Sequence, residues 1–181
     1  MNQMERQSDV GSVAWGALAR RGAIGGLVGG IALAMLMMIV TAAKGMGLLR
    51  PLYLIAATFH GSWAMAKGVD IVPLVIGLMV HMLNSIIFGV VFALLLGSVT
   101  GTRRWGATAW TVSGLVWGLI VFIVNQYVVL PAVDPAMAMG ADKVLFWWVL
   151  GHMMFGLILG FIVGSQAGVR SVAPAGVRQP I

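Results

Sequence analysis

Four long apolar stretches constrain this chain more than any other feature of its sequence. They cover roughly residues 22–45, 71–99, 106–130 and 144–165. A transmembrane helix needs about 20 predominantly apolar residues, and each stretch is at least that long. The sequence therefore predicts an all-α polytopic membrane protein with four transmembrane helices and with the lipid bilayer as a partner.

The composition agrees with a chain that lies mostly in the membrane. Hydrophobic residues make up 60% of the 181 positions and charged residues only 9%, fewer charges than a soluble domain of this size carries. The absence of cysteine excludes disulfides, iron–sulfur clusters and cysteine nucleophiles. The net charge of +6 comes from basic residues near the helix ends, where membrane topology accounts for them, so no nucleic acid is expected as a partner.

The basic residues also predict an orientation. If the N-terminus lies in the cytoplasm, the cytoplasmic segments hold seven Lys and Arg residues and the opposite segments hold four. The positive-inside rule then favours both termini in the cytoplasm, with residues 1–21 and 167–181 as tails. The first apolar run exceeds the roughly 7–15 residues of a signal-peptide core, which predicts a retained helix.

The chain reads as one helical hairpin used twice, over residues 22–99 and 100–166. In both units an Arg-Arg pair, a glycine-rich helix, a proline segment and a second helix with a His-Met pair follow in the same order. The repeats are parallel, so a pseudo-twofold four-helix bundle is expected. The spacing of apolar residues in the longer first connection predicts a short interfacial helix near residues 51–66. Its predicted apolar face consists of Leu52, Ile55, Phe59 and Trp63.

Small residues follow each His-Met pair at steps of four, which places them on one face of a helix. A stripe of small residues in an apolar helix lets another helix approach very closely. We therefore predict helix packing at Gly26, Gly30, Ser85, Gly89, Gly114, Gly118, Gly156, Gly160 and Gly164. The chain has 25 glycines, more than one four-helix core needs, and this surplus suggests a partner.

The polar residues inside the predicted spans gather in the half of the bilayer away from the termini. His81 and His152 lie at similar depth, and Asn84, Asn125 and Gln126 accompany them. We expect His81, Asn84 and Ser85 to share one helix face, because residues three and four apart are neighbours on a helix. The structural interpretation is that these side chains hydrogen-bond between helices. Because an ionisable residue within the membrane is also a candidate for function, cofactor hypotheses stay open.

Two cofactors are considered beside the default of none. His81 and His152 could supply both axial ligands of a haem b, with the glycines below them making room for the porphyrin. Imidazole and thioether also suit monovalent copper, which would be bound by His81, Met82, His152 and Met153. The outer loop would add Met137, Met139, Asp134 and Asp142.

The sequence offers little for catalysis or coupled transport. It has no nucleophile elbow and no metalloprotease helix motif, and the four apolar stretches contain no Asp or Glu. The favoured interpretation is a non-enzymatic structural or accessory subunit that packs against itself or a larger membrane complex. A haem or copper protein is the first alternative, and a passive channel or small transporter is the second.

Five segments carry a resemblance to a known group of proteins. They are residues 25–38, 47–52, 81–89, 130–131 and 152–160, which include the glycine-rich first helix and both histidines. In these segments the chain resembles uncharacterised bacterial inner-membrane proteins of the YagU-like family. The resemblance implies a four-helix protein of the bacterial inner membrane and supplies no established activity.

Overall fold

The computed structural model describes residues 3–60, 70–99, 105–135, 138 and 144–168. In that part of the chain every regular element is a helix. The elements are α1 (Gln3–Ala43), α2 (Arg50–His60), α3 (Ile71–Ser98), α4 (Ala107–Val124), the π-helix η3 (Asn125–Val129), α5 (Leu130–Val133) and α7 (Leu145–Gly168). Four spans are long and apolar enough to cross a membrane, Trp15–Ala43, Ile71–Ser98, Ala107–Val133 and Leu145–Ser165. This confirms the all-α prediction with four spanning helices.

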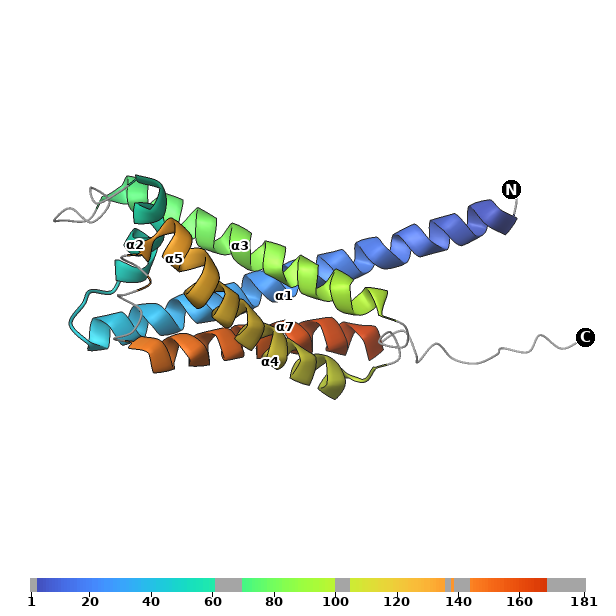
Figure 1. Ribbon diagram of the computed structural model, residues 1–181. Coiled ribbons are helices and arrows are strands. Elements are labelled where there is room, and N and C mark those ends of the chain that lie inside the picture. Colours follow the sequence, from blue (N-terminus) through green and yellow to red (C-terminus); the bar gives the residue numbers. More distant parts are fainter. Residues whose placement is uncertain (1–2, 61–69, 100–104, 136–137, 139–143, 169–181) are drawn as a thin grey trace, which may run out of the picture.

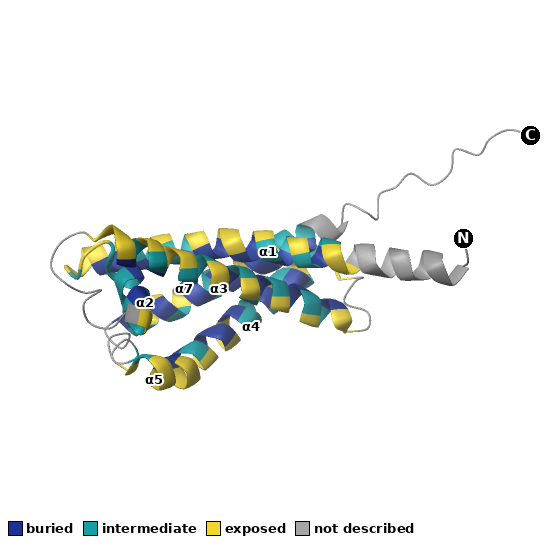
Figure 2. Ribbon diagram, turned by 90° about the horizontal axis from the view of Figure 1, so that it is seen from above, coloured by how far each residue is buried: buried dark blue, intermediate teal, exposed yellow. Residues whose placement is uncertain are grey.

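The four long helices pack in the order α3, α1, α7, α4. α1 packs closely against both α3 and α7, and α4 packs closely against α7, whereas α3 and α4 barely touch. α1 begins and α7 ends at the same end of the bundle, here called the terminal end, and α2 lies at the opposite end, the α2 end (Figure 1). From above, α4 and α5 diverge from the other helices toward the α2 end (Figure 2).

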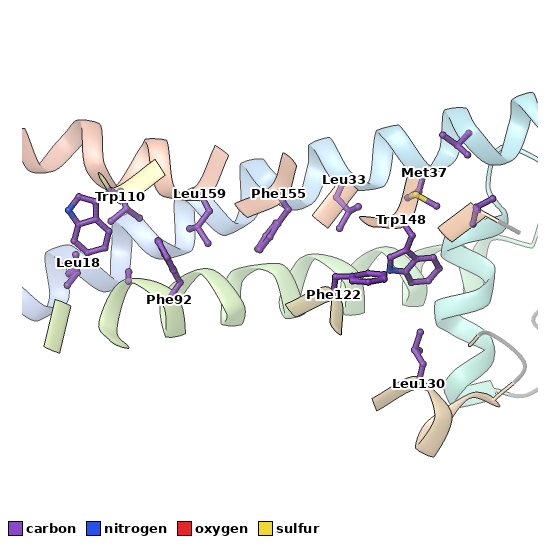
Figure 3. Close-up of a cluster of buried hydrophobic side chains, with 14 residues drawn as sticks. Leu18, Leu33, Met37, Phe92, Trp110, Phe122, Leu130, Trp148, Phe155 and Leu159 are labelled. Carbon is purple, nitrogen blue, oxygen red and sulfur yellow. The ribbon is translucent and has the colours of Figure 1, made fainter. Parts of the chain in front are cut away.

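Buried apolar side chains form one row along the inside of the bundle. Figure 3 shows the row running from Leu18 and Trp110 near the terminal end to Met37 and Trp148 near the α2 end. The outward faces are apolar as well, as contact with lipid requires; the side chain of Ile39, for example, is 61% exposed. The fold is therefore that of a multi-pass helical membrane protein.

α1 is longer than the sequence indicated. It begins at Gln3 instead of near Gly22. The described residues of the expected N-terminal tail are therefore helical and continuous with the first span. No proline interrupts this segment, and its early residues are mostly good helix formers. The helix ends as expected, because Gly45 adopts a φ of 70° and the amide of Met46 donates to the carbonyl of Thr41. This is a Schellman cap, and the left-handed residue favours glycine.

The third span is not the continuous α-helix that the sequence suggested. Its α-helical part ends at Val124, and a π-helical turn over Asn125–Val129 leads into α5. Pro131 explains the change, because its ring would clash with the carbonyl four residues earlier, at Tyr127, in a regular α-helix. The wider turn avoids that clash and leads into α5.

The predicted interfacial helix is present but faces its neighbours differently. α2 ends at His60, and residues 61–69, with Trp63, lie outside the described residues. The helix crosses the α2 end of the bundle (Figure 1) and packs against α3. Its buried side chains are Leu52 and Ala56, whereas Phe59 is 64% exposed. Leu52 of the predicted apolar face is thus buried against the protein, whereas Phe59 lies on a side of α2 that the described residues leave uncovered.

Candidate functional site

The first hairpin is held by backbone contact between α1 and α3. A Cβ atom added at Gly22 would collide with the carbonyl of Gly89, and one added at Gly26 would collide with the carbonyl of Ser85. At Gly30 an added Cβ would strike the side chain of Ser85. Only glycine fits at these positions, because the facing atoms belong mainly to rigid backbone.

The second hairpin repeats this arrangement between α4 and α7. A Cβ atom at Gly114 would collide with the carbonyl of Gly156, and one at Gly118 would collide with the carbonyl of His152. Added atoms at Gly160 and Gly164 would meet Trp110. If His152 is aligned with His81, Gly156 takes the place of Ser85, and Gly114 takes the place of Gly26. All of the predicted packing residues thus lie in two equivalent interfaces inside the chain.

The glycine stripes of the two hairpins do not provide a free surface for a partner. In each hairpin, the small residues of one helix face the small residues of the other. Gly25 and Gly29 bring α1 against Leu159 and Phe155 of α7. The glycines of these stripes are used for close packing within the chain. A surface for a partner therefore has to be sought elsewhere.

His81 links the two helices of the first hairpin. Its side chain is half-buried, and its Nε2 donates a hydrogen bond of 2.9 Å to the carbonyl oxygen of Gly30 on α1. The carbonyl can only accept, so Nε2 carries the proton in this arrangement. One turn below, the Ser85 hydroxyl donates to the His81 carbonyl at 2.8 Å.

His152 is buried within the second hairpin. Its Nδ1 donates to the carbonyl of Trp148 at 2.9 Å, and its ring stacks on that indole with ring centroids 6.1 Å apart. The ring of Phe122 on α4 meets it edge-on at 5.7 Å. The two histidines are thus engaged separately, each with its own hairpin. Phe122 was not predicted beside His152, because no spacing rule joins positions on different helices, whereas the spacing of four between Trp148 and His152 on α7 could have indicated that contact.

The geometry provides little for the haem hypothesis. Each imidazole donates one ring N–H to a backbone carbonyl, through Nε2 in His81 and through Nδ1 in His152, so only the other ring nitrogen could coordinate iron. The space beside the glycines, which was expected to hold a porphyrin, is filled by the facing helix.

The geometry is equally unfavourable for copper. A histidine and the methionine that follows it point about 100° apart on a helix, so neither Met82 nor Met153 can join its neighbour in one site. No three His, Cys, Asp or Glu side chains gather among the described residues. Met137, Met139 and Asp142 of the outer loop lie outside those residues.

We expect the purified protein to show no haem band in a reduced-minus-oxidised absorption spectrum. The reason is that a porphyrin beside the glycines would require the packed helices of each hairpin to separate. A sharp band near one haem per chain, lost in both His81→Ala and His152→Ala, would overturn this expectation. Elemental analysis of the same sample tests for colourless monovalent copper.

The other polar residues of the spans occupy three different environments. Gln126 is buried in the π-helical turn, where its Nε2 donates to the carbonyl of Ala138 at 3.1 Å. Its Oε1 has no partner among the described residues. Asn125 is half-buried, and Asn84 is exposed. The expectation that Asn84 shares a face with Ser85 fails, because adjacent residues on a helix point in different directions.

One polar link joins the two hairpins at the α2 end. The Thr58 hydroxyl of α2 donates to a carboxylate oxygen of Asp134 at 3.0 Å, just after α5. The sequence placed both residues outside the membrane but could not pair them, because 76 positions separate them. The link fixes α2 between α3 and the end of the third span.

α3 and α4 leave an apolar crevice between them, and it breaks the symmetry of the bundle. Its volume is about 300 Å³. It is lined by Phe92, Leu95, Leu96, Val112, Ser113, Val116, Trp117 and Ile120. In a complete pseudo-twofold bundle, α3 would pack on α4 as α7 packs on α1.

The cause of the open crevice lies in the residues that replace the α1 glycines. When Gly26 is aligned with Gly114, Gly29 corresponds to Trp117, and Gly25 corresponds to Ser113. At Gly29 the absence of a side chain lets α7 approach α1. At the equivalent position on α4, the Trp117 indole fills this space and contacts Phe92 of α3, with ring centroids 6.0 Å apart. α3 is therefore kept away from α4.

These features define an apolar bundle of four spans. The two helices of each hairpin are in close contact, and α3 and α4 leave a crevice between the hairpins. No family model, curated protein or solved structure matches the chain. Kinship with the YagU-like family therefore remains a prediction from the sequence.

Proposed function

We propose that the chain is a non-enzymatic accessory subunit of a membrane assembly, which packs against itself or a larger complex through the face between α3 and α4. The observation that carries this proposal is the crevice of about 300 Å³ between two helices that the pseudo-symmetry would bring into contact. The open face replaces the glycine stripes, which the sequence had suggested as the contact surface.

The physical argument rests on shape, because lipid chains and apolar side chains are equally hydrophobic. Helices associate in membranes through close packing and interhelical hydrogen bonds. The crevice has projecting walls, at Leu95 and Val116, and a floor at Phe92 and Trp117. A helix with side chains that fit between these walls would gain contacts that disordered acyl chains make less well.

We further propose that the protein lies in a bacterial inner membrane with both termini in the cytoplasm. The four spans put the start of α1 and the end of α7 at one end of the bundle (Figure 1). The exposed Arg20 lies at that end. α3 ends and α4 begins there (Figure 1), and the Arg103–Arg104 pair falls between these two helices in the sequence. The positive-inside rule supports a cytoplasmic location for this end.

Native mass measurement in mild detergent tests the proposed function. We expect a species of at least twice the 19.1 kDa of one chain, or a defined complex with another protein. Val116→Trp would fill the crevice and should reduce that species, because Val116 is 53% exposed in its wall. Met35→Trp is the matched control, since Met35 is 57% exposed on α1 and outside the crevice. A strict monomer that co-purifies with no other protein would contradict the proposal.

A further inference from the structure

Asn84 exposes an amide to the middle of the bilayer. It follows Ile71 by 13 residues and precedes Ser98 by 14 in the 28-residue helix α3. At about 1.5 Å per residue it lies roughly 20 Å from either end, beyond the reach of lipid headgroups. The side chain is exposed and makes no hydrogen bond to any residue that the structure describes. An unpaired amide in hydrocarbon is costly, so a polar partner is expected there.

The alignment of the two hairpins shows which way Asn84 faces. If His81 is matched to His152, Asn84 corresponds to Phe155, whose carbonyl and ring meet Gly29 of α1. Asn84 thus occupies the α3 position that would contact α4 in a symmetric bundle. Because α3 and α4 barely touch, Asn84 is exposed instead.

Asn84 also belongs to a regular stripe on α3. Phe88, Val91 and Leu95 follow it at steps of four, three and four residues. This is the spacing of a left-handed helix pair, the commonest crossing geometry in membrane bundles. Val91 is 38% exposed, and Leu95 is 54% exposed. We call these four residues the Asn84 stripe.

We infer that a second copy of this chain packs on the Asn84 stripe and that the two Asn84 side chains hydrogen-bond to each other at the bilayer centre. This inference rests on the proposed function and names the partner. Two copies inserted in one orientation are related by a twofold axis along the membrane normal, so equivalent residues lie at equal depth. The amide of asparagine has both a donor and an acceptor, so it complements itself across that axis. A different partner would need its own polar group at this depth.

The absence of cysteine allows a direct test of the contact, because a single introduced thiol is the only one in the chain. Val91→Cys lies on the stripe, and oxidation in the membrane should cross-link it to a dimer, since a disulfide needs Cα atoms within about 7 Å. Leu83→Cys is the matched control, because Leu83 is 58% exposed on the same helix but points away from the stripe. It should cross-link much less. Cross-linking at Leu83 in preference to Val91 would overturn the inference.

The contribution of the amide is tested by dimer dissociation of cysteine-free variants. Asn84→Leu should weaken the dimer by about 3- to 30-fold, the effect of one interhelical hydrogen bond in a membrane. Asn84→Gln should retain much of the affinity, and Leu83→Ala should leave it unchanged. A dimer insensitive to Asn84→Leu, or a complex with a different protein only, would overturn the inference but leave the proposed function standing. A strict monomer that binds nothing would overturn both.

Discussion

Replacing Gly156 with valine should separate α4 from α7 and destabilise the whole bundle. The Cβ atom would overlap the carbonyl oxygen of Gly114 and approach the amide of Gly118, and neither backbone group can rotate away. Overpacking in protein interiors costs about 1–3 kcal/mol and sometimes more, and a clash with the backbone of the facing helix belongs at or above the upper limit. We expect a clear fall in the midpoint of unfolding when the purified protein is titrated with a denaturing detergent.

Gly16→Ala is the control for this substitution. Gly16 also lies in a long helix, on α1, but an added Cβ would meet nothing within 4 Å. Alanine favours helix over glycine by up to about 1 kcal/mol, so this variant should unfold at the same or a higher detergent concentration than the wild type. Equal midpoints for the wild type and Gly156→Val would show that α4 and α7 are not held by the contact described here.

Substitutions at Gly156 and Gly16 are expected to have opposite effects, although both glycines lie in long apolar helices. This difference shows which features the sequence could predict and which it could not. The lengths of the apolar stretches predicted the spans, because only the hydrocarbon thickness has to be matched. Spacing by four predicted which residues share a stripe. The pattern did not show which face of each helix points into the protein and which points toward lipid. Lipid and the protein interior are both apolar, so every face of the helix is hydrophobic. Asn84 was accordingly expected beside Ser85 and is instead exposed.

Other features were not predicted from the sequence, because each depends on a single side chain at one position. Trp117 alone, in the place of a glycine, converts an expected helix contact into a crevice. Pro131 changes the backbone of the residues before it, and the link between Thr58 and Asp134 joins α2 to the end of α5. None of these follows from periodicity, because each depends on a single residue and not on a repeated pattern.

Replacing Gly77 with valine should release α2 from the bundle while the four spans remain folded. The Cβ atom would collide with the backbone carbonyl of Leu52, which lies directly on α3. An 11-residue helix is too short to be stable alone, so α2 should lose its order as it leaves. The hydrogen bond from Thr58 to Asp134 would keep it nearby, but one such bond contributes only about 1 kcal/mol.

Thiol labelling measures this release. Ala56 is fully buried, so Ala56→Cys in the cysteine-free chain should react slowly with a membrane-impermeant maleimide. If the clash costs about 1–3 kcal/mol, Gly77→Val should raise the labelling rate by about 5- to 150-fold through a larger population of undocked α2. Leu48→Cys, at a side chain that is 52% exposed, should react equally in both backgrounds. Slow labelling of Ala56→Cys in the Gly77→Val background would mean that α2 does not depend on its contact with Gly77. A lower unfolding midpoint of the Gly77→Val protein would mean that α2 stabilises the four spans.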